Sequence, residues 1–313
     1  MSYQSKGSNL PVDRGNLEGA IISYWEIKEE QARKARAKKA AKAAAKKRAD
    51  AILAGMDPDA DIYGLAEEVS VAESSQEDIA LGDENDDQDA GTEGSVRGGK
   101  QFDPIVSLVA NFFRAAGYPS SCIQTASQLE LPGFYRPQKK WDVVVTWGKF
   151  LVAAFELKAL GGPSYGNNFN NRVEEAVGSA TDVRRAFSSQ HPARPPWLGY
   201  FYLMEDDAGS RRPVKTAKSP IPVSDKWTNL SYQERGGVFC ERLLAENLYD
   251  AVCYVTAPKG SGSFTEPVPS VGWSAFSETI IDRIEVLRAA GIPGVRIPGQ
   301  ASQMEQIALD DLD

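Results

Sequence analysis

Three ionisable residues, Asp142, Glu156 and Lys158, lie inside two short apolar stretches of the sequence. The stretches run from Trp141 to Trp147 and from Phe150 to Lys158. Both are rich in Val, Ala and aromatic residues, a pattern typical of strands that are covered on both faces. An ionisable side chain in such a strand needs a specific partner, because burying an unpaired charge is costly.

Side chains two residues apart on a strand point to the same face, so Glu156 and Lys158 project together while Leu157 points to the opposite side. If the two strands pair as a hairpin about Gly148-Lys149, Asp142 lies close to Glu156 at the end away from the turn. Two carboxylates then converge on one amine. Mg²⁺ is commonly held by one or two carboxylates together with water and phosphate oxygens.

We therefore expect Asp142 and Glu156 to be metal ligands for Mg²⁺. Lys158 is expected to stabilise charge that builds on phosphorus or to help deprotonate the attacking water. A structural ion pair on a strand face would show the same three residues.

An Asp, 13 intervening residues and then Glu-x-Lys resembles the active-site pattern of the PD-(D/E)xK nucleases. The surrounding sequence resembles the XhoI-type restriction endonucleases. The matching blocks are LPGFYRPQKKWDVVV, AAFELKALGGPSYGNNFNNRVEEAVGSATD, LGYFYLMED and YQERGGVFCERLLAENLYDAVCYV. Together with shorter matches upstream, the resemblance covers most of the chain.

This resemblance implies an α/β fold, a PD-(D/E)xK restriction-endonuclease-like mixed sheet flanked by helices. It also implies a type II endonuclease that cuts both strands of a short palindromic DNA site with Mg²⁺, the site being CTCGAG by family analogy. A palindromic site matches a two-fold protein, so a homodimer is expected. A DNA methyltransferase of the same specificity would be the genetic partner.

Three alternatives remain open at the level of sequence. One is a repair or modification-dependent nuclease of the same fold, and another is a noncatalytic sequence-specific DNA-binding protein. The third is a helical interaction adaptor built on residues 17–55.

Further acidic residues could assist the metal. Glu130 precedes the first matching block, while Glu174 and Glu175 lie on the helix expected from Arg172 to Phe187. The two neighbouring glutamates flank the apolar stripe of that helix on opposite sides, so periodicity does not choose between them. Solvent exposure is the alternative for all three carboxylates.

Two segments are candidates for DNA contact. A short basic cluster of Arg136, Lys139 and Lys140 precedes Asp142 and suits phosphates. The segment after Lys158 is expected to be a loop, and its amide and guanidinium groups suit base edges; these residues are Asn167, Asn168, Asn170, Asn171 and Arg172. The alternative is that the asparagines build turns and cap the next helix.

Periodicity and capping signals also predict the remaining elements. Helices are expected over Leu17 to about Gly55, Pro104 to Ala116, Tyr232 to Leu248 and Ser274 to Ala290, and strands over Trp197 to Met204 and Ala251 to Thr256. The expected division is an N-terminal helical arm over residues 1–56, an acidic flexible insertion over 57–94, the nuclease domain over 95–295 and a polar tail over 296–313.

The net charge of −8 is the sum of two regions of opposite charge. Residues 57–93 contain 14 acidic residues and no Lys or Arg, which leaves 35 basic against 29 acidic residues in the rest of the chain. That remainder is mildly basic, as phosphate binding requires.

The sequence contains three cysteines without paired spacing and a single histidine, His191. We expect buried free thiols in a reducing cytoplasm, where disulfides are rare. The lack of histidine chemistry favours carboxylates and Lys158. No apolar run is long enough for a membrane span and no secretory signal is evident, so a cytoplasmic protein is expected.

Overall fold

The computed structural model describes residues 11–53, 100–125 and 130–293. The chain forms two compact units, one made of residues 1–22 with 102–313 and the other of residues 23–101. The expected acidic insertion (57–94) and polar tail (296–313) lie outside the described residues. Among the described helices, none is both long and apolar enough to cross a membrane.

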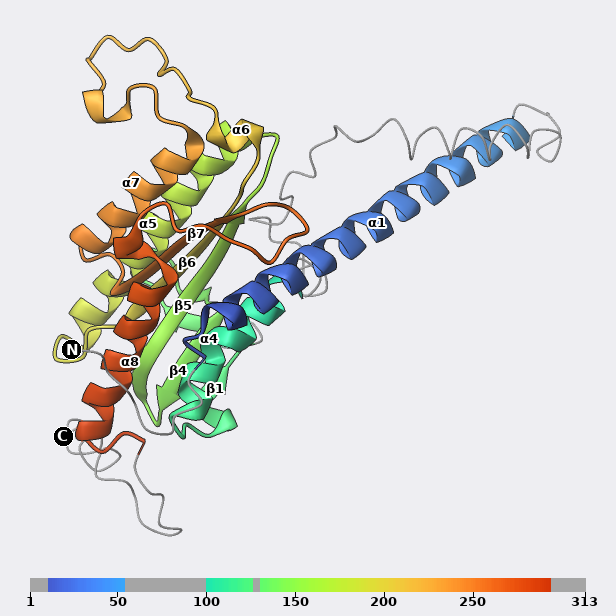
Figure 1. Ribbon diagram of the computed structural model, residues 1–313. Coiled ribbons are helices and arrows are strands. Elements are labelled where there is room, and N and C mark those ends of the chain that lie inside the picture. Colours follow the sequence, from blue (N-terminus) through green and yellow to red (C-terminus); the bar gives the residue numbers. More distant parts are fainter. Residues whose placement is uncertain (1–10, 54–99, 126–129, 294–313) are drawn as a thin grey trace. The chain divides into compact units, whose positions relative to one another are not determined.

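The first unit is built on a five-stranded mixed sheet (Figure 1). Its strand order is β1-β4-β5-β6-β7, with bounds Ile123–Gln124, Val143–Trp147, Phe150–Leu160, Leu198–Glu205 and Ala251–Ala257. The β1-β4 and β4-β5 pairs are antiparallel, whereas β5, β6 and β7 run parallel. A separate antiparallel pair is formed by β2, Glu130–Pro132, and β3, Gln138–Lys140. The expected α/β architecture with a mixed sheet is confirmed.

The β4-β5 hairpin turns at Gly148, whose φ of 58° is readily adopted by glycine. Its register pairs Val143 with Phe155 and Val145 with Ala153. The hairpin predicted about Gly148-Lys149 is therefore confirmed.

Helices cover both faces of the sheet (Figure 1). On one face, α5 (Tyr165–Gln190) and α7 (Tyr232–Ala245) share a buried cluster with the sheet residues Tyr200 and Tyr202. On the other face, Phe155 contacts Phe113 of α4 (Asp103–Ala115) and Phe276 of α8 (Trp273–Ala289). Because consecutive strand residues alternate between faces, Phe155 lies on the α4/α8 side and Glu156 on the α5 side.

Short elements complete the described chain. They are α6 at Ala208–Arg211 and 3₁₀ turns at Lys100–Phe102, Ser120–Cys122, Asp225–Trp227 and Pro269–Val271. All three cysteines are buried free thiols, as expected.

The prediction for the segment after Lys158 was wrong in one respect. The asparagine-rich stretch was expected to be a loop up to Arg172, but α5 already begins at Tyr165. Tyr165 and Phe169 are buried one helical turn apart, on the same face as Ala176. Burial of this apolar stripe outweighs the weak helix propensity of asparagine.

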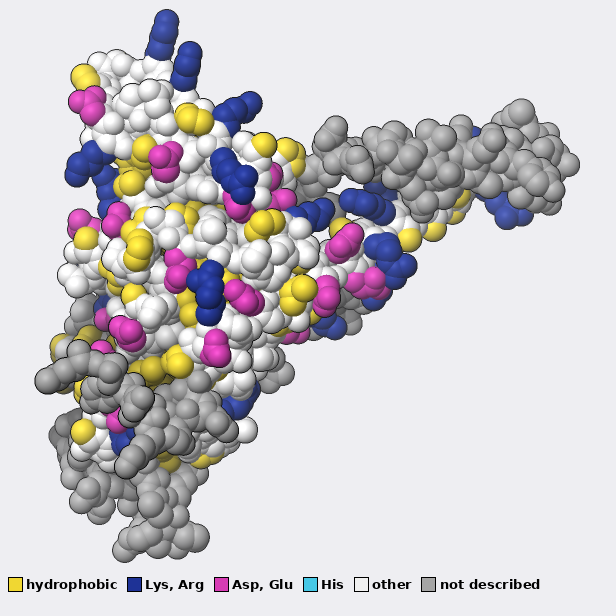
Figure 2. Space-filling view, viewed as in Figure 1, with side chains coloured by type: hydrophobic (Ala, Val, Ile, Leu, Met, Phe, Trp, Pro, Cys, Tyr) yellow, Lys and Arg dark blue, Asp and Glu magenta, His cyan; other side chains and the backbone are white. Residues whose placement is uncertain are grey.

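Helix α1 runs from Arg14 to Leu53 and so begins three residues earlier than predicted. The Asp13 carboxylate accepts the N–H of Gly15 at 3.0 Å and so satisfies a backbone donor at the start of the helix. In the second unit, every Lys and Arg between residues 33 and 48 is exposed, and Figure 2 shows such dark-blue side chains along this helix.

Candidate functional site

Strand β5 places Glu156 and Lys158 on the face covered by α5. Glu156 is only 5% exposed, and its Oε1 lies 3.2 Å from the Lys158 Nζ. Leu157 between them is buried on the opposite side. The shared face predicted from the period-two spacing is confirmed.

Asp142 lies directly before β4 and is held against β5 by two hydrogen bonds. Its backbone N–H donates to the Phe155 carbonyl at 3.0 Å. Its Oδ2 accepts the N–H of Leu157 at 2.7 Å. These bonds hold its carboxylate beside the Glu156 and Lys158 pair, as the hairpin predicted.

The two carboxylates influence each other's ionisation. Burial, and then the negative charge of Glu156, raise the pKa of Asp142 to about 7. Burial also opposes ionisation of Glu156, but the positive charges of Lys139 and Lys158 outweigh it and lower the Glu156 pKa. Glu156 is thus the ionised centre of the cluster.

Lys139 has a role that the sequence did not reveal. It was predicted to contact phosphates, yet its Nζ lies 2.7 Å from Glu156 Oε2 and 5.0 Å from the centre of the Trp141 ring. β3 therefore directs this ammonium group into the carboxylate cluster. Proximity to Asp142 in the sequence was the only signal that could have suggested it.

The structure distinguishes the two adjacent glutamates on α5. Glu175 Oε2 lies 3.7 Å from Lys158 Nζ and 2.8 Å from Arg172 Nη1. Glu174 is exposed and lines a separate pocket of about 340 Å³ together with Arg235. Glu175, not Glu174, therefore lies beside the cluster.

Arg172 does not fit the contact with base edges that was expected of it. Its side chain is 6% exposed and its guanidinium is paired with Glu175 inside the protein. This position suits a residue that orients Glu175 beside Lys158.

The contacts of Glu130 lie within the two-stranded β2-β3 sheet. Its carboxylate accepts a hydrogen bond from Gln138, and in the register it lies opposite Lys140. Glu130 is partly exposed, and these contacts favour the alternative that it is a surface residue.

The chemistry of the donor atoms fits a hard divalent cation. Asp142 and Glu156 are adjacent carboxylates whose repulsion already raises one pKa, and a cation between them would relieve that repulsion. Each Glu156 oxygen accepts one lysine hydrogen bond and has a further lone pair. Within the described ranges, no group of three or more His, Cys, Asp or Glu is arranged to hold a metal, so phosphate and water oxygens would have to complete the coordination.

The predicted asparagine contacts lie on the first two turns of α5. Asn167, Asn170 and Asn171 are exposed, and Asn168 is half-buried. In the basic cluster, Lys140 is exposed, while Arg136 forms an ion pair of 2.7 Å with Asp182 and keeps 43% of its side chain exposed.

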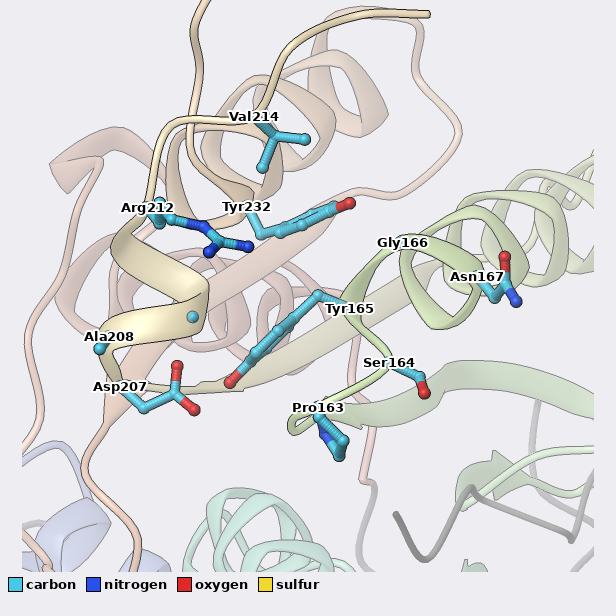
Figure 3. Close-up of a pocket in the computed structure, with 11 residues that line it drawn as sticks. Pro163, Ser164, Tyr165, Gly166, Asn167, Asp207, Ala208, Arg212, Val214 and Tyr232 are labelled. Atoms are coloured by element: carbon cyan, nitrogen blue, oxygen red, sulfur yellow. The ribbon is translucent and has the colours of Figure 1, made fainter. Parts of the chain in front are cut away.

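A pocket of about 650 Å³ opens at the start of α5 (Figure 3). The rings of Tyr165 and Tyr232 stack in it at 5.6 Å, and the Arg212 guanidinium lies beside them. The Asp207 carboxylate points toward the Tyr165 hydroxyl, and burial together with this charge raises the pKa of Tyr165. The carboxylate cluster does not line this pocket, but Asn167 does.

The chain is similar in sequence to known restriction enzymes. A family model described as Restriction endonuclease XhoI matches residues 82–267. The type II restriction enzyme BstVI of Geobacillus stearothermophilus is 40% identical over 182 residues, which cover 56% of this chain and 81% of that protein. The type II restriction enzyme XhoI of Xanthomonas vasicola is 41% identical over 167 residues, which cover 51% and 67%. AbrI of Azospirillum brasilense, also named a type II restriction enzyme, is 44% identical over 112 residues, which cover 34% and 50%. No solved structure matches.

Proposed function

We propose that Asp142, Glu156 and Lys158 perform the phosphodiester hydrolysis catalysed by this chain. The chain belongs to the XhoI restriction endonuclease family and is a type II site-specific deoxyribonuclease. The observation that carries this proposal is the convergence of these three side chains on one buried face of β5. Lys158 stabilises the charge that develops on the scissile phosphate or assists in deprotonating the attacking water.

Asp142 and Glu156 would hold Mg²⁺, which when bound supplies Lewis-acid polarisation of the phosphate and lowers the pKa of water. Lys139 keeps Glu156 ionised and orients its carboxylate. Arg172 and Glu175 orient Lys158 from the α5 side.

The proposed substrate is a short palindromic site in double-stranded DNA, CTCGAG by family analogy. A homodimer would present two copies of the cluster, one to each strand. A cognate DNA methyltransferase would be the genetic partner that protects the host site.

Two surfaces are proposed to contact this DNA. The exposed Asn167, Asn170 and Asn171 offer paired donors and acceptors to base edges, and the exposed Lys140 and Arg136 offer positive charge to phosphates. Figure 2 shows further Lys and Arg side chains projecting over the segment between α6 and α7.

Helix α1 contributes a third basic surface, which we assign to the DNA backbone. From residue 33 to residue 48 it consists only of Lys, Arg and Ala, with nine basic residues and no acidic one. Such a helix has no wide apolar face for a protein partner but matches the charge of a phosphate chain.

The decisive experiment is digestion of a fully sequenced, unmethylated DNA with Mg²⁺, followed by mapping of all ends. Discrete ends at one palindrome would establish both the reaction and the site. Scattered ends would indicate a repair-type nuclease. Specific binding without cleavage would indicate a noncatalytic DNA-binding protein.

A further inference from the structure

The turn between β2 and β3, residues 133–137, exposes two aromatic rings. Phe134 is 48% exposed and Tyr135 is 73% exposed. Their ring centroids are 5.0 Å apart in an edge-to-face arrangement. We call this segment the aromatic turn.

Asp182 of α5 holds the aromatic turn in one conformation. Its carboxylate is buried and accepts the N–H groups of Phe134 at 2.7 Å and Tyr135 at 2.8 Å. It also accepts a hydrogen bond from the Arg136 Nε–H at 2.7 Å. These three hydrogen bonds to one buried carboxylate fix the backbone of the turn. The Phe134 and Tyr135 side chains nevertheless remain exposed to solvent.

Close packing restrains the turn further. The Gly133 N–H donates to the Pro137 carbonyl at 3.2 Å and closes the turn. A Cβ at Gly133 would lie 2.5 Å from the Arg136 carbonyl oxygen and 2.6 Å from Asp182 Oδ2, so only glycine fits there. The exposed rings are therefore presented on a rigid support, which lowers the entropy lost when they bind a partner.

Positive charge surrounds the two rings. The Arg185 guanidinium lies 5.3 Å from the centre of the Phe134 ring. Arg136 follows in the turn and Lys140 ends the adjoining β3, and both are exposed. Exposed aromatic rings among basic side chains match a partner that combines stacked bases with phosphates.

The same hairpin reaches the reaction centre, because β3 also carries Lys139, whose Nζ is 2.7 Å from Glu156. We propose that Phe134 and Tyr135 stack against base or sugar faces of the bound duplex next to the scissile phosphate, and unstack a base step there. This inference rests on the proposed function, since it takes the DNA substrate as the occupant of the surface.

The test compares the full-length wild type with the double variant Phe134→Ala/Tyr135→Ala. Val286→Ala is the matched control, because Val286 is a 64% exposed apolar residue of α8, on the opposite side of the sheet. The probe is a duplex that contains the mapped site with 2-aminopurine at successive positions, studied with Ca²⁺ in place of Mg²⁺. Binding is followed by fluorescence anisotropy and unstacking by the 2-aminopurine signal.

We expect the double variant to bind this duplex about 10-fold or more weakly for each stacked ring lost, and to lose the fluorescence increase that the wild type produces. Its midpoint of urea unfolding should stay close to that of the wild type, because both rings are exposed. The control should match the wild type in every measurement.

Unchanged affinity and unchanged 2-aminopurine signal in the double variant would overturn the inference. An altered oligomeric state in sedimentation, with unchanged affinity per dimer, would also overturn it and identify the rings as a contact between copies of the chain. If wild-type digestion produces no discrete ends, the proposed function fails. The aromatic turn is then tested separately by comparing the affinity of the wild type and of the double variant for a random-sequence duplex, and equal affinities would overturn the inference.

Discussion

Replacing Glu156 by Gln tests the proposed centre most directly. The substitution keeps the shape of the side chain but removes the charge between Lys139 Nζ at 2.7 Å and Lys158 Nζ at 3.2 Å. It also replaces one proposed carboxylate ligand of Mg²⁺ by a neutral amide. We expect the cleavage rate on the mapped site to fall at least about 100- to 1,000-fold, the usual effect of losing one preorganised charge-stabilising group.

The same change should reduce stability. Breaking a fully buried ion pair costs about 3–5 kcal/mol because a charge is left uncompensated. The two lysine side chains are 19% and 16% exposed, and loss of the Glu156 charge removes the repulsion that disfavours ionised Asp142. Both factors reduce the expected cost to about 1–3 kcal/mol, measured by urea unfolding.

Single-turnover cleavage and gel-shift binding should be measured on the same preparations. Glu174→Gln is the matched control, because this adjacent helix residue is exposed and lines a different pocket. The double variant Lys139→Gln/Glu156→Gln should regain part of the lost stability but none of the cleavage. A folded Glu156→Gln protein that cuts within about 10-fold of the wild-type rate would refute the assignment of the site, given the size of effect expected for such a group.

Three further outcomes are expected. Asp182→Asn should destabilise the protein near neutral pH, because the N–H groups of Tyr135 and Phe134 and the Arg136 side chain lower the Asp182 pKa despite burial. The stabilisation from Asp182 is present above its unfolded pKa of about 4 and is lost as the pH falls through the lower folded pKa. In urea unfolding between pH 7 and pH 3, the stability difference between wild type and variant should therefore shrink, and a constant difference would contradict this reasoning. Gly199→Ala should cost about 1–3 kcal/mol or more, since the added Cβ would overlap the Phe155 ring, and an unchanged urea midpoint would contradict the packing described for this face. Replacing the four lysines between residues 38 and 46 of α1 by Gln should reduce the magnitude of the slope of log binding constant against log salt concentration, for nonspecific DNA, by up to about 3–4 units. Site-specific cleavage at low salt should be retained. An unchanged slope would show that α1 does not contact the DNA backbone.

Much of the centre followed from local pattern alone. The period of two along a strand placed Glu156 and Lys158 on one face and Leu157 on the other, and the short turn at Gly148 brought Asp142 beside them. These relations depend only on residues close in sequence, so backbone geometry determined them before any packing was known. Most helices and strands were located to within a few residues for the same reason.

Features that depend on contacts between residues distant in sequence were decided only by the tertiary structure. Asparagine-rich composition indicated a loop, but burial of Tyr165 and Phe169 under the sheet extended α5 through it. Helical spacing left Glu174 and Glu175 equivalent until the position of Lys158 on β5 selected Glu175.

The same holds for the side chains that surround the centre. Arg172 was predicted to contact base edges and Lys139 to contact phosphates, yet both are directed to carboxylates inside the protein. The Asp182 carboxylate holds a turn that lies 46 to 48 residues earlier in the chain. Residue type and spacing thus indicated the proposed chemistry and determined the strand that carries these residues. The partners that orient each charge come from separate elements and exist only once those elements pack together.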